Sequence, residues 1–147
     1  MRKIFFLIGF ISVLSLFAPT VSFAQHKPGS GGWSPQSTYG KIYNPKTVET
    51  ISGVVEKIEK ITPIEGMTLG IQILLKTDKE TVSVHLGPAW YIENQDYAIE
   101  PGDKIEVKGS KCTFQGKPSI MAAEVKKGDN IMKVRDEKGF PFWCCWK

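Results

Sequence analysis

The chain has 147 residues and a formal net charge of +4, with 41% hydrophobic and 23% charged residues. This length is enough for one domain, and the composition is that of a globular protein rather than a disordered, collagen-like or coiled-coil chain. The 14 glycines and 9 prolines favour a strand-rich domain over a helical bundle, and 3 cysteines are too few for a disulfide scaffold.

Residues 1–24 have the pattern of a cleaved signal peptide. Arg2 and Lys3 precede an uncharged, largely apolar run over residues 4–18, and small residues stand at positions 22 and 24. We expect Gln25 to be the first mature residue and the protein to be periplasmic or secreted. The alternative is an uncleaved anchor, for which a run of about 15 residues is short. Loss of Arg2 and Lys3 lowers the net charge to about +2, which argues against non-specific nucleic-acid binding.

Residues 25–44 are rich in Gly, Ser, Pro and Gln. Because such a segment buries little apolar area, we interpret it as a flexible leader. Its large apolar side chains are Trp33, Tyr39 and Tyr43. We expect disorder before Tyr39 and packing against the domain from Tyr43 onward.

Residues 45–143 are predicted to form the folded domain, in which short strands alternate with turns. A β-branched stretch over residues 48–61 is interrupted by Gly53, which indicates a bulge or bend. Residues 67–76 and 81–86 alternate apolar and polar side chains and are separated by a polar turn, which predicts a hairpin. Pro88 is suited to begin a short helix within residues 89–95. Further strands are expected over residues 104–111 and 118–126, with a short last strand over residues 131–135.

Five main strands with one short helix between the third and the fourth predict an all-β fold. The arrangement is that of a five-stranded OB-type Greek-key barrel. An SH3-like barrel is the main competing fold, but it would not need the helix after Pro88.

Several stretches of the domain are similar to a known group of proteins. They are HLGPAWY at 85–91, PGDKIEVKGS at 101–110, AAEV at 122–125 and VRDEKGFPFW at 134–143. The chain resembles exported bacterial OB-fold proteins, a group that includes small periplasmic proteins and domains of magnetosome-associated and electron-transfer proteins. The resemblance covers residues 48–143 and implies the OB fold and export. It implies no settled activity.

Five residues of the domain are candidates for ligand binding: His85, Trp90, Tyr91, Arg135 and Trp143. His85 is expected on the outer face or the rim of the barrel, where it either ligates metal, transfers protons or fixes the next turn. The aromatic rings either stack a ligand or close the barrel end. Arg135 either holds an anion or pairs with a neighbouring carboxylate. We favour the turn for His85, barrel closure for Trp90 and Trp143, and the ion pair for Arg135.

The cysteines are Cys112, Cys144 and Cys145, of which the last two belong to a tail at residues 144–147. Adjacent cysteines rarely bridge each other, so a disulfide from Cys112 to one of them would leave one free thiol. The alternatives are an intermolecular disulfide, inert thiols, or soft-metal binding by Cys144 and Cys145. The chain has no Cys-x-x-Cys motif, which argues against covalent haem and a thioredoxin-like site.

The sequence contains no nucleophile elbow, zinc-protease motif or phosphate-binding glycine loop. We therefore predict a non-enzymatic periplasmic binding or adaptor module that has no cofactor and no membrane span after cleavage, and whose partner is a protein or a small ligand. One alternative is a metal-handling or redox accessory protein that uses the C-terminal cysteines. The other is a nucleic-acid-binding OB protein, which the small charge and the expected export both disfavour.

Overall fold

The computed structural model describes residues 31–96 and 98–143. Two short 3-10 turns, η1 (Gly40–Ile42) and η2 (Pro45–Thr47), precede the sheet. The remaining elements are β1 (Val48–Ile61), β2 (Gly70–Lys76), β3 (Thr81–Pro88), α1 (Ala89–Ile92), β4 (Lys104–Phe114), β5 (Lys117–Lys127) and β6 (Asn130–Lys133). The predicted signal peptide, residues 25–30 of the predicted leader and the cysteine tail lie outside the described residues.

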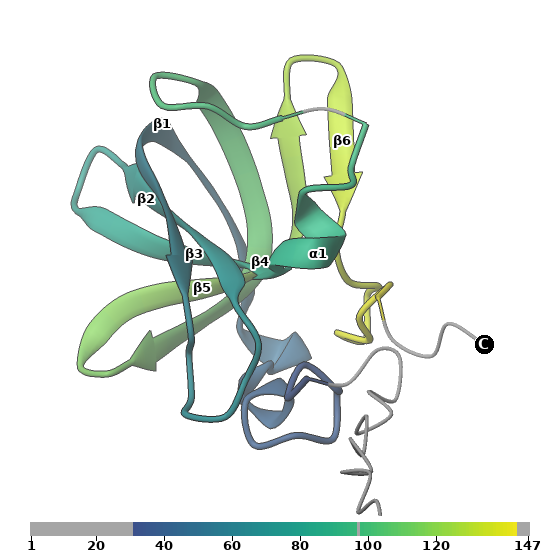
Figure 1. Ribbon diagram of the computed structural model, residues 1–147. Coiled ribbons are helices and arrows are strands. Elements are labelled where there is room, and N and C mark those ends of the chain that lie inside the picture. Colours follow the sequence, from purple (N-terminus) through teal and green to yellow (C-terminus); the bar gives the residue numbers. More distant parts are fainter. Residues whose placement is uncertain (1–30, 97, 144–147) are drawn as a thin grey trace, which may run out of the picture.

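The strands close into a barrel (Figure 1). β1 pairs antiparallel with β2 and β4, β2 with β3, and β4 with β5. A short parallel pairing of residues 83–85 of β3 with residues 119–121 of β5 joins the two ends of the sheet. β6 extends the sheet beyond β5. The predicted fold class is therefore confirmed: an all-β, five-stranded OB-type barrel with one short helix between β3 and β4, followed by the short last strand.

β1 belongs to both halves of the barrel because it bends. Residues 48–54 pair with β4, and residues 54–61 pair with β2, with an irregular register between Val55 and Lys57. A Cβ atom at Gly53 would collide with the Lys76 carbonyl oxygen. Glycine thus allows β1 to approach the end of β2 closely, at the point where the strand changes partner.

The interior of the barrel is filled by the alternate side chains that the period-2 pattern assigns to one face. Burial of this apolar area is the main favourable contribution to folding. The members with at most 1% exposure include Val55, Ile73, Leu75, Val84, Leu86, Val107, Ile120 and Val125.

The segment over residues 31–44, which we call the N-terminal segment, packs against the barrel. Trp33 and Tyr39 are each only 2% exposed, and the Trp33 indole Nε1 donates a hydrogen bond to the Thr68 carbonyl oxygen at 3.1 Å. The expectation of disorder before Tyr39 is therefore wrong for residues 31–38. The segment is rich in Gly and Ser, but it also contains three aromatic rings. The apolar area that these rings bury is large enough to order the segment.

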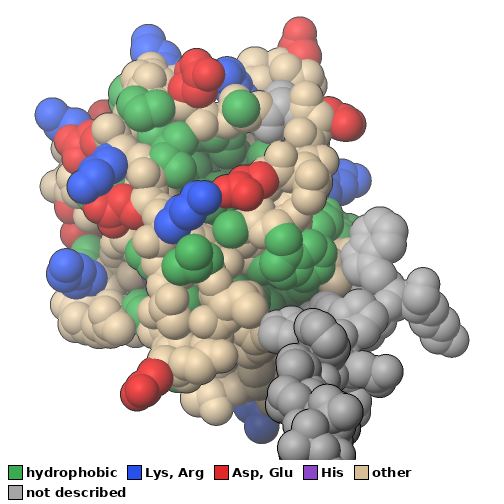
Figure 2. Space-filling model, viewed as in Figure 1, with side chains coloured by type: hydrophobic (Ala, Val, Ile, Leu, Met, Phe, Trp, Pro, Cys, Tyr) green, Lys and Arg blue, Asp and Glu red, His purple; other side chains and the backbone are tan. Residues whose placement is uncertain are grey.

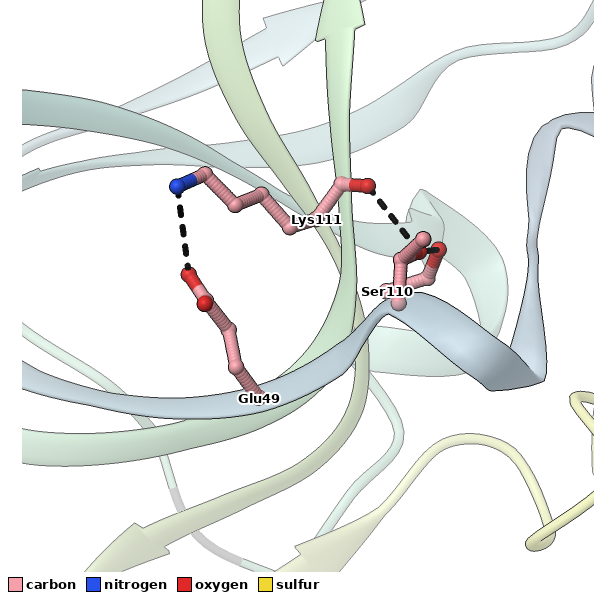
Figure 3. Close-up of polar contacts among 4 residues, drawn as sticks. Glu49, Ser110 and Lys111 are labelled. Carbon is pink, nitrogen blue, oxygen red and sulfur yellow. Dashed lines mark hydrogen bonds and ion pairs between the residues drawn. The ribbon is translucent and has the colours of Figure 1, made fainter.

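The end of the N-terminal segment is fastened to β4 through Ser110, beside the Lys111–Glu49 ion pair that Figure 3 shows. Ser110 is fully buried, and its Oγ accepts from the Asn44 amide at 3.0 Å and lies 2.9 Å from Thr47 Oγ1. Thr47 Oγ1 is also 3.1 Å from the Lys111 carbonyl oxygen. The exposed Lys111–Glu49 ion pair beside them spans 3.9 Å and contributes little, since surface ion pairs are screened by water.

Candidate functional site

A groove of about 640 Å³ crosses the outer faces of β2 and β3, which we call the β2–β3 groove. The loop after β1 forms one side of it, and the β4–β5 hairpin forms the other. Its neutral polar lining consists of Thr62, Gln72, Thr81, Ser83, Gln115 and Ser119. In OB-type barrels this face, together with these two loops, is the one that binds ligands.

The charged side chains of the β2–β3 groove are Glu59 and Lys117. Glu59 already has two partners, because it accepts a hydrogen bond from Gln72 Nε2 at 3.1 Å and pairs with Lys57 at 3.0 Å. Phe114 supplies a partly buried aromatic ring beside the polar side chains. The groove therefore offers neutral hydrogen-bonding groups and one aromatic surface. It does not have a strongly positive or strongly negative electrostatic potential.

His85 lies on the outer face of β3 among the groove residues, yet it is only 3% exposed. The reason is the N-terminal segment: the Tyr39 ring stacks on His85 with centroids 5.9 Å apart, and its hydroxyl lies 3.0 Å from His85 Nδ1. Phe114 meets the imidazole edge-on with centroids 5.0 Å apart and also meets the Tyr39 ring edge-on at 6.2 Å, so the three rings form one cluster. Nε2 is buried and has no hydrogen-bond partner in the described part of the chain.

Burial fixes the charge states of this pair. Desolvation, with a further contribution from the positive charge of Arg135, lowers the pKa of His85 to about 4. Desolvation also raises the pKa of Tyr39. At neutral pH the imidazole is therefore uncharged and the phenol keeps its proton, so neither group is poised to exchange protons with a substrate.

Arg135 is 5% exposed and lies in a cage of aromatic rings instead of an ion pair. Its guanidinium carbon is 4.8 Å from the Trp143 ring and 5.3 Å from the Tyr43 ring, and Nη1 donates to the Gly139 carbonyl oxygen at 3.2 Å. The attraction between the cation and these rings replaces a counter-ion.

The expectation that Arg135 pairs with Asp136 or Glu137 is wrong, since neither forms an ion pair with it within 4.0 Å across residues 31–96 and 98–143. Asp136 instead uses Oδ1 to accept from the Lys138 and Phe140 amides, which closes its own turn.

The aromatic candidates separate into buried and exposed side chains. Trp143 is fully buried, donates from Nε1 to the Trp33 carbonyl oxygen at 2.9 Å and packs against Gly87 of β3, as expected of a ring that closes the barrel. Tyr91 is partly buried against Trp143, with centroids 5.7 Å apart. Trp90 is 43% exposed, so the expectation that it closes the barrel is wrong. The first turn of α1 directs Trp90 to solvent while Ala89 is buried.

An apolar hollow of about 260 Å³ lies on another face, between β1, α1 and the chain before β4. Figure 2 shows apolar side chains gathered on this face. Ile58, Ile92 and Met132 are among its lining, and the exposed Lys60–Glu93 ion pair joins β1 to α1 beside it at 3.0 Å. Apart from the charged residues Glu59, Lys60 and Glu93, the hollow is lined by apolar side chains, whereas the β2–β3 groove has six neutral polar ones.

Residues 31–96 and 98–143 contain one histidine, His85, and one cysteine, Cys112. Within these ranges no group of three or more His, Cys, Asp or Glu side chains is placed to hold a metal ion. No helix there is long and apolar enough to cross a membrane. Cys112 is partly buried, which raises the pKa of its thiol. Cys144 and Cys145 lie outside the described residues, so their pairing and their metal binding stay predictions.

Comparison with known proteins places the barrel in a family. The model of the MamS/MamX magnetosome protein family matches residues 47–132. The chain belongs to this family. The match confirms the resemblance to magnetosome-associated proteins that the sequence indicates. No curated protein matches the chain.

The MamS/MamX match contains all five barrel strands and the whole β2–β3 groove. Trp33, Tyr39, Arg135 and Trp143 lie outside the matched range. The groove is therefore built from the part of the chain that defines the family, and the aromatic packing beside it is contributed by flanking segments.

Of the five sequence-predicted residues, only His85 lines the β2–β3 groove. Gln72, Ser83 and Phe114 line the groove but were not predicted as site residues from the sequence. Gln72 and Ser83 could have been predicted from the apolar–polar alternation in β2 and β3. The polar residues of two paired strands point to the same outer face as His85. Phe114 is the last residue of β4, and a large apolar ring at the end of a strand, next to a turn, was a further signal.

Proposed function

We propose that this MamS/MamX family protein is a non-enzymatic binding module, exported through a cleaved signal peptide, that takes up a neutral polar ligand in the β2–β3 groove. The observation that carries the proposal is the groove lining, where six neutral side chains able to hydrogen-bond stand beside the Phe114 ring. Hydrogen-bonding groups orient a ligand, and an aromatic surface supplies contact area.

The charges of the groove support a neutral ligand over a nucleic acid. Nucleic-acid affinity depends on several lysines or arginines that neutralise phosphates. Lys117 is the cationic residue of the groove lining, and the Glu59 carboxylate lines the same groove. This balance gives a polyanion little to bind.

The state of the titratable groups supports binding without turnover. His85 has a pKa of about 4 and is neutral and buried at physiological pH. Glu59 is held by Gln72 and Lys57. General acid–base catalysis needs a group with a pKa near the working pH, and the pKa of His85 is far below it.

Amide chemical-shift mapping on the ¹⁵N-labelled protein tests the proposal. The probes are a neutral oligosaccharide (cellohexaose), a neutral Gly-Ser peptide and an oligothymidylate at physiological salt. We expect a neutral probe to shift amides of β2, β3 and the β4–β5 hairpin, and the oligothymidylate to leave them unchanged. Shifts confined to other faces, or a groove that responds to the oligothymidylate alone, contradict the proposal.

Blocking the groove gives a second test. Ser83→Trp places a large ring on the groove floor, and we expect it to abolish the shifts. Thr113→Trp is the matched control, because Thr113 is an exposed residue of the same β4–β5 hairpin but does not line the groove. Binding by Ser83→Trp at wild-type strength contradicts the proposal.

The export part of the proposal has its own measurement. Intact mass of the protein recovered from the periplasm is expected to correspond to a chain that starts at Gln25. A mass that retains residues 1–24 contradicts cleavage.

A further inference from the structure

The imidazole of His85 has one nitrogen with a partner and one without. Nδ1 lies 3.0 Å from the Tyr39 hydroxyl oxygen. Nε2 has no partner among the described residues, although the side chain lines the β2–β3 groove. A buried polar atom without a partner destabilises the protein, so a groove ligand that completes this hydrogen bond removes that cost.

Counting donors and acceptors assigns the ring proton. If the Tyr39 hydroxyl donates to Nδ1, the ring proton is on Nε2, and that N–H is the one group left without a partner. If Nδ1–H donates to the Tyr39 oxygen instead, both the hydroxyl proton and the Nε2 lone pair lack partners among the described residues. The first arrangement leaves fewer groups unsatisfied. His85 therefore presents an N–H donor at Nε2.

The surroundings of this donor favour a sugar over a peptide. An extended peptide binds a sheet by pairing with the backbone of an open edge. The groove instead crosses β2 and β3 where their backbones are already paired with each other. A sugar needs no backbone edge, because its apolar ring face packs on an aromatic ring such as Phe114 while its hydroxyls exchange hydrogen bonds with neutral side chains.

We infer that the β2–β3 groove binds a neutral oligosaccharide, and that binding exposes Nε2–H of His85, which then donates a hydrogen bond to one of the ligand oxygens. The inference rests on the proposed function and adds the ligand class and the residue that selects it. His85 acts here as a binding residue that Tyr39 orients.

The tautomer is measurable without any ligand. Long-range ¹H–¹⁵N correlation on the free protein is expected to show His85 with its proton on Nε2. A proton on Nδ1, or an imidazole that titrates near its ordinary pKa, overturns the inference.

Titration with cellohexaose tests the bond itself. His85→Phe keeps a ring but removes the donor, and we expect affinity to fall by about fivefold to tenfold, the range of a neutral hydrogen bond. His85→Gln restores an N–H and is expected to bind more tightly than His85→Phe. Tyr39→Phe, which releases Nδ1 while keeping His85, is expected to weaken binding and provides the test if His85→Phe does not fold.

The outcomes separate the two claims. Groove binding of cellohexaose with equal affinity in the wild type and His85→Phe overturns the inference and leaves the proposed function intact. A groove that responds to the neutral peptide but not to cellohexaose overturns the ligand class alone. A groove that responds to no neutral probe overturns both.

Discussion

The free energy of unfolding is expected to fall by about 2 kcal/mol between pH 7 and pH 5 because of His85 alone. Burial and the charge of Arg135 lower its pKa from 6.5 to about 4. The unfolded chain therefore binds a proton more readily than the folded protein. As the pH falls below 6.5 the unfolded state is stabilised by protonation, and the loss of stability continues until the folded protein also takes up the proton near pH 4.

Urea unfolding followed by tryptophan fluorescence at pH 7 and pH 5 measures this effect. The wild type is compared with His85→Gln, which cannot titrate. All other ionisable side chains are common to both proteins, so the difference between the two losses isolates His85. The packed neighbours contribute no proton in this range, because the pKa values of Tyr39 and Cys112 are raised and Arg135 stays charged. Equal losses in the two proteins would refute the reasoning.

Two further predictions concern packing, each checked by chemical denaturation. Trp143→Ala is expected to destabilise the protein by about 3–5 kcal/mol, since the ring is fully buried, whereas Trp90→Ala on the surface should cost about 0.5 kcal/mol or less. Gly139→Ala should cost about 2 kcal/mol or more, because φ is +87° and a Cβ would collide with Tyr43. Gly128→Ala, with a positive φ but open space, is its control and should cost less. A larger loss of stability for Trp90→Ala than for Trp143→Ala, or for Gly128→Ala than for Gly139→Ala, contradicts the packing described.

The barrel was predictable because its signals are local. Alternation and turn residues specify a strand from a few neighbouring side chains, and the bounds expected for the first strand are those of β1. The short helix after Pro88 was likewise indicated by one residue that cannot continue the ladder.

The N-terminal segment was not predictable because its contacts are distant. Trp33 and Trp143 meet across 110 positions, which neither composition nor periodicity reports. The same limit explains why burial was predicted correctly for Trp143 and wrongly for Trp90. The two side chains are equally apolar, and only the tertiary structure decides which one is buried. Arg135 shows a further limit: two acidic residues follow it in sequence, but aromatic rings from elsewhere surround it.

For a related reason, the sequence predicted one residue of the candidate site but not the contacts that determine its role. His85 stands out by residue type, whereas its role depends on Tyr39 and Phe114, which come from separate parts of the chain. A sequence indicates which chemistry is present, but the hydrogen-bonding state of a histidine follows from its neighbours in space.

The contact between Trp33 and Trp143 also determines how the molecule opens. The Trp143 indole holds the N-terminal segment through the Trp33 carbonyl, so release of either chain segment exposes the other's ring. Neither segment belongs to the closed ladder of β1 to β5, and both therefore separate from it at a lower free energy than global unfolding. In native-state hydrogen exchange, amides in residues 31–43 and 134–143 are expected to lose protection together, as one cooperative unit, while the barrel strands remain protected.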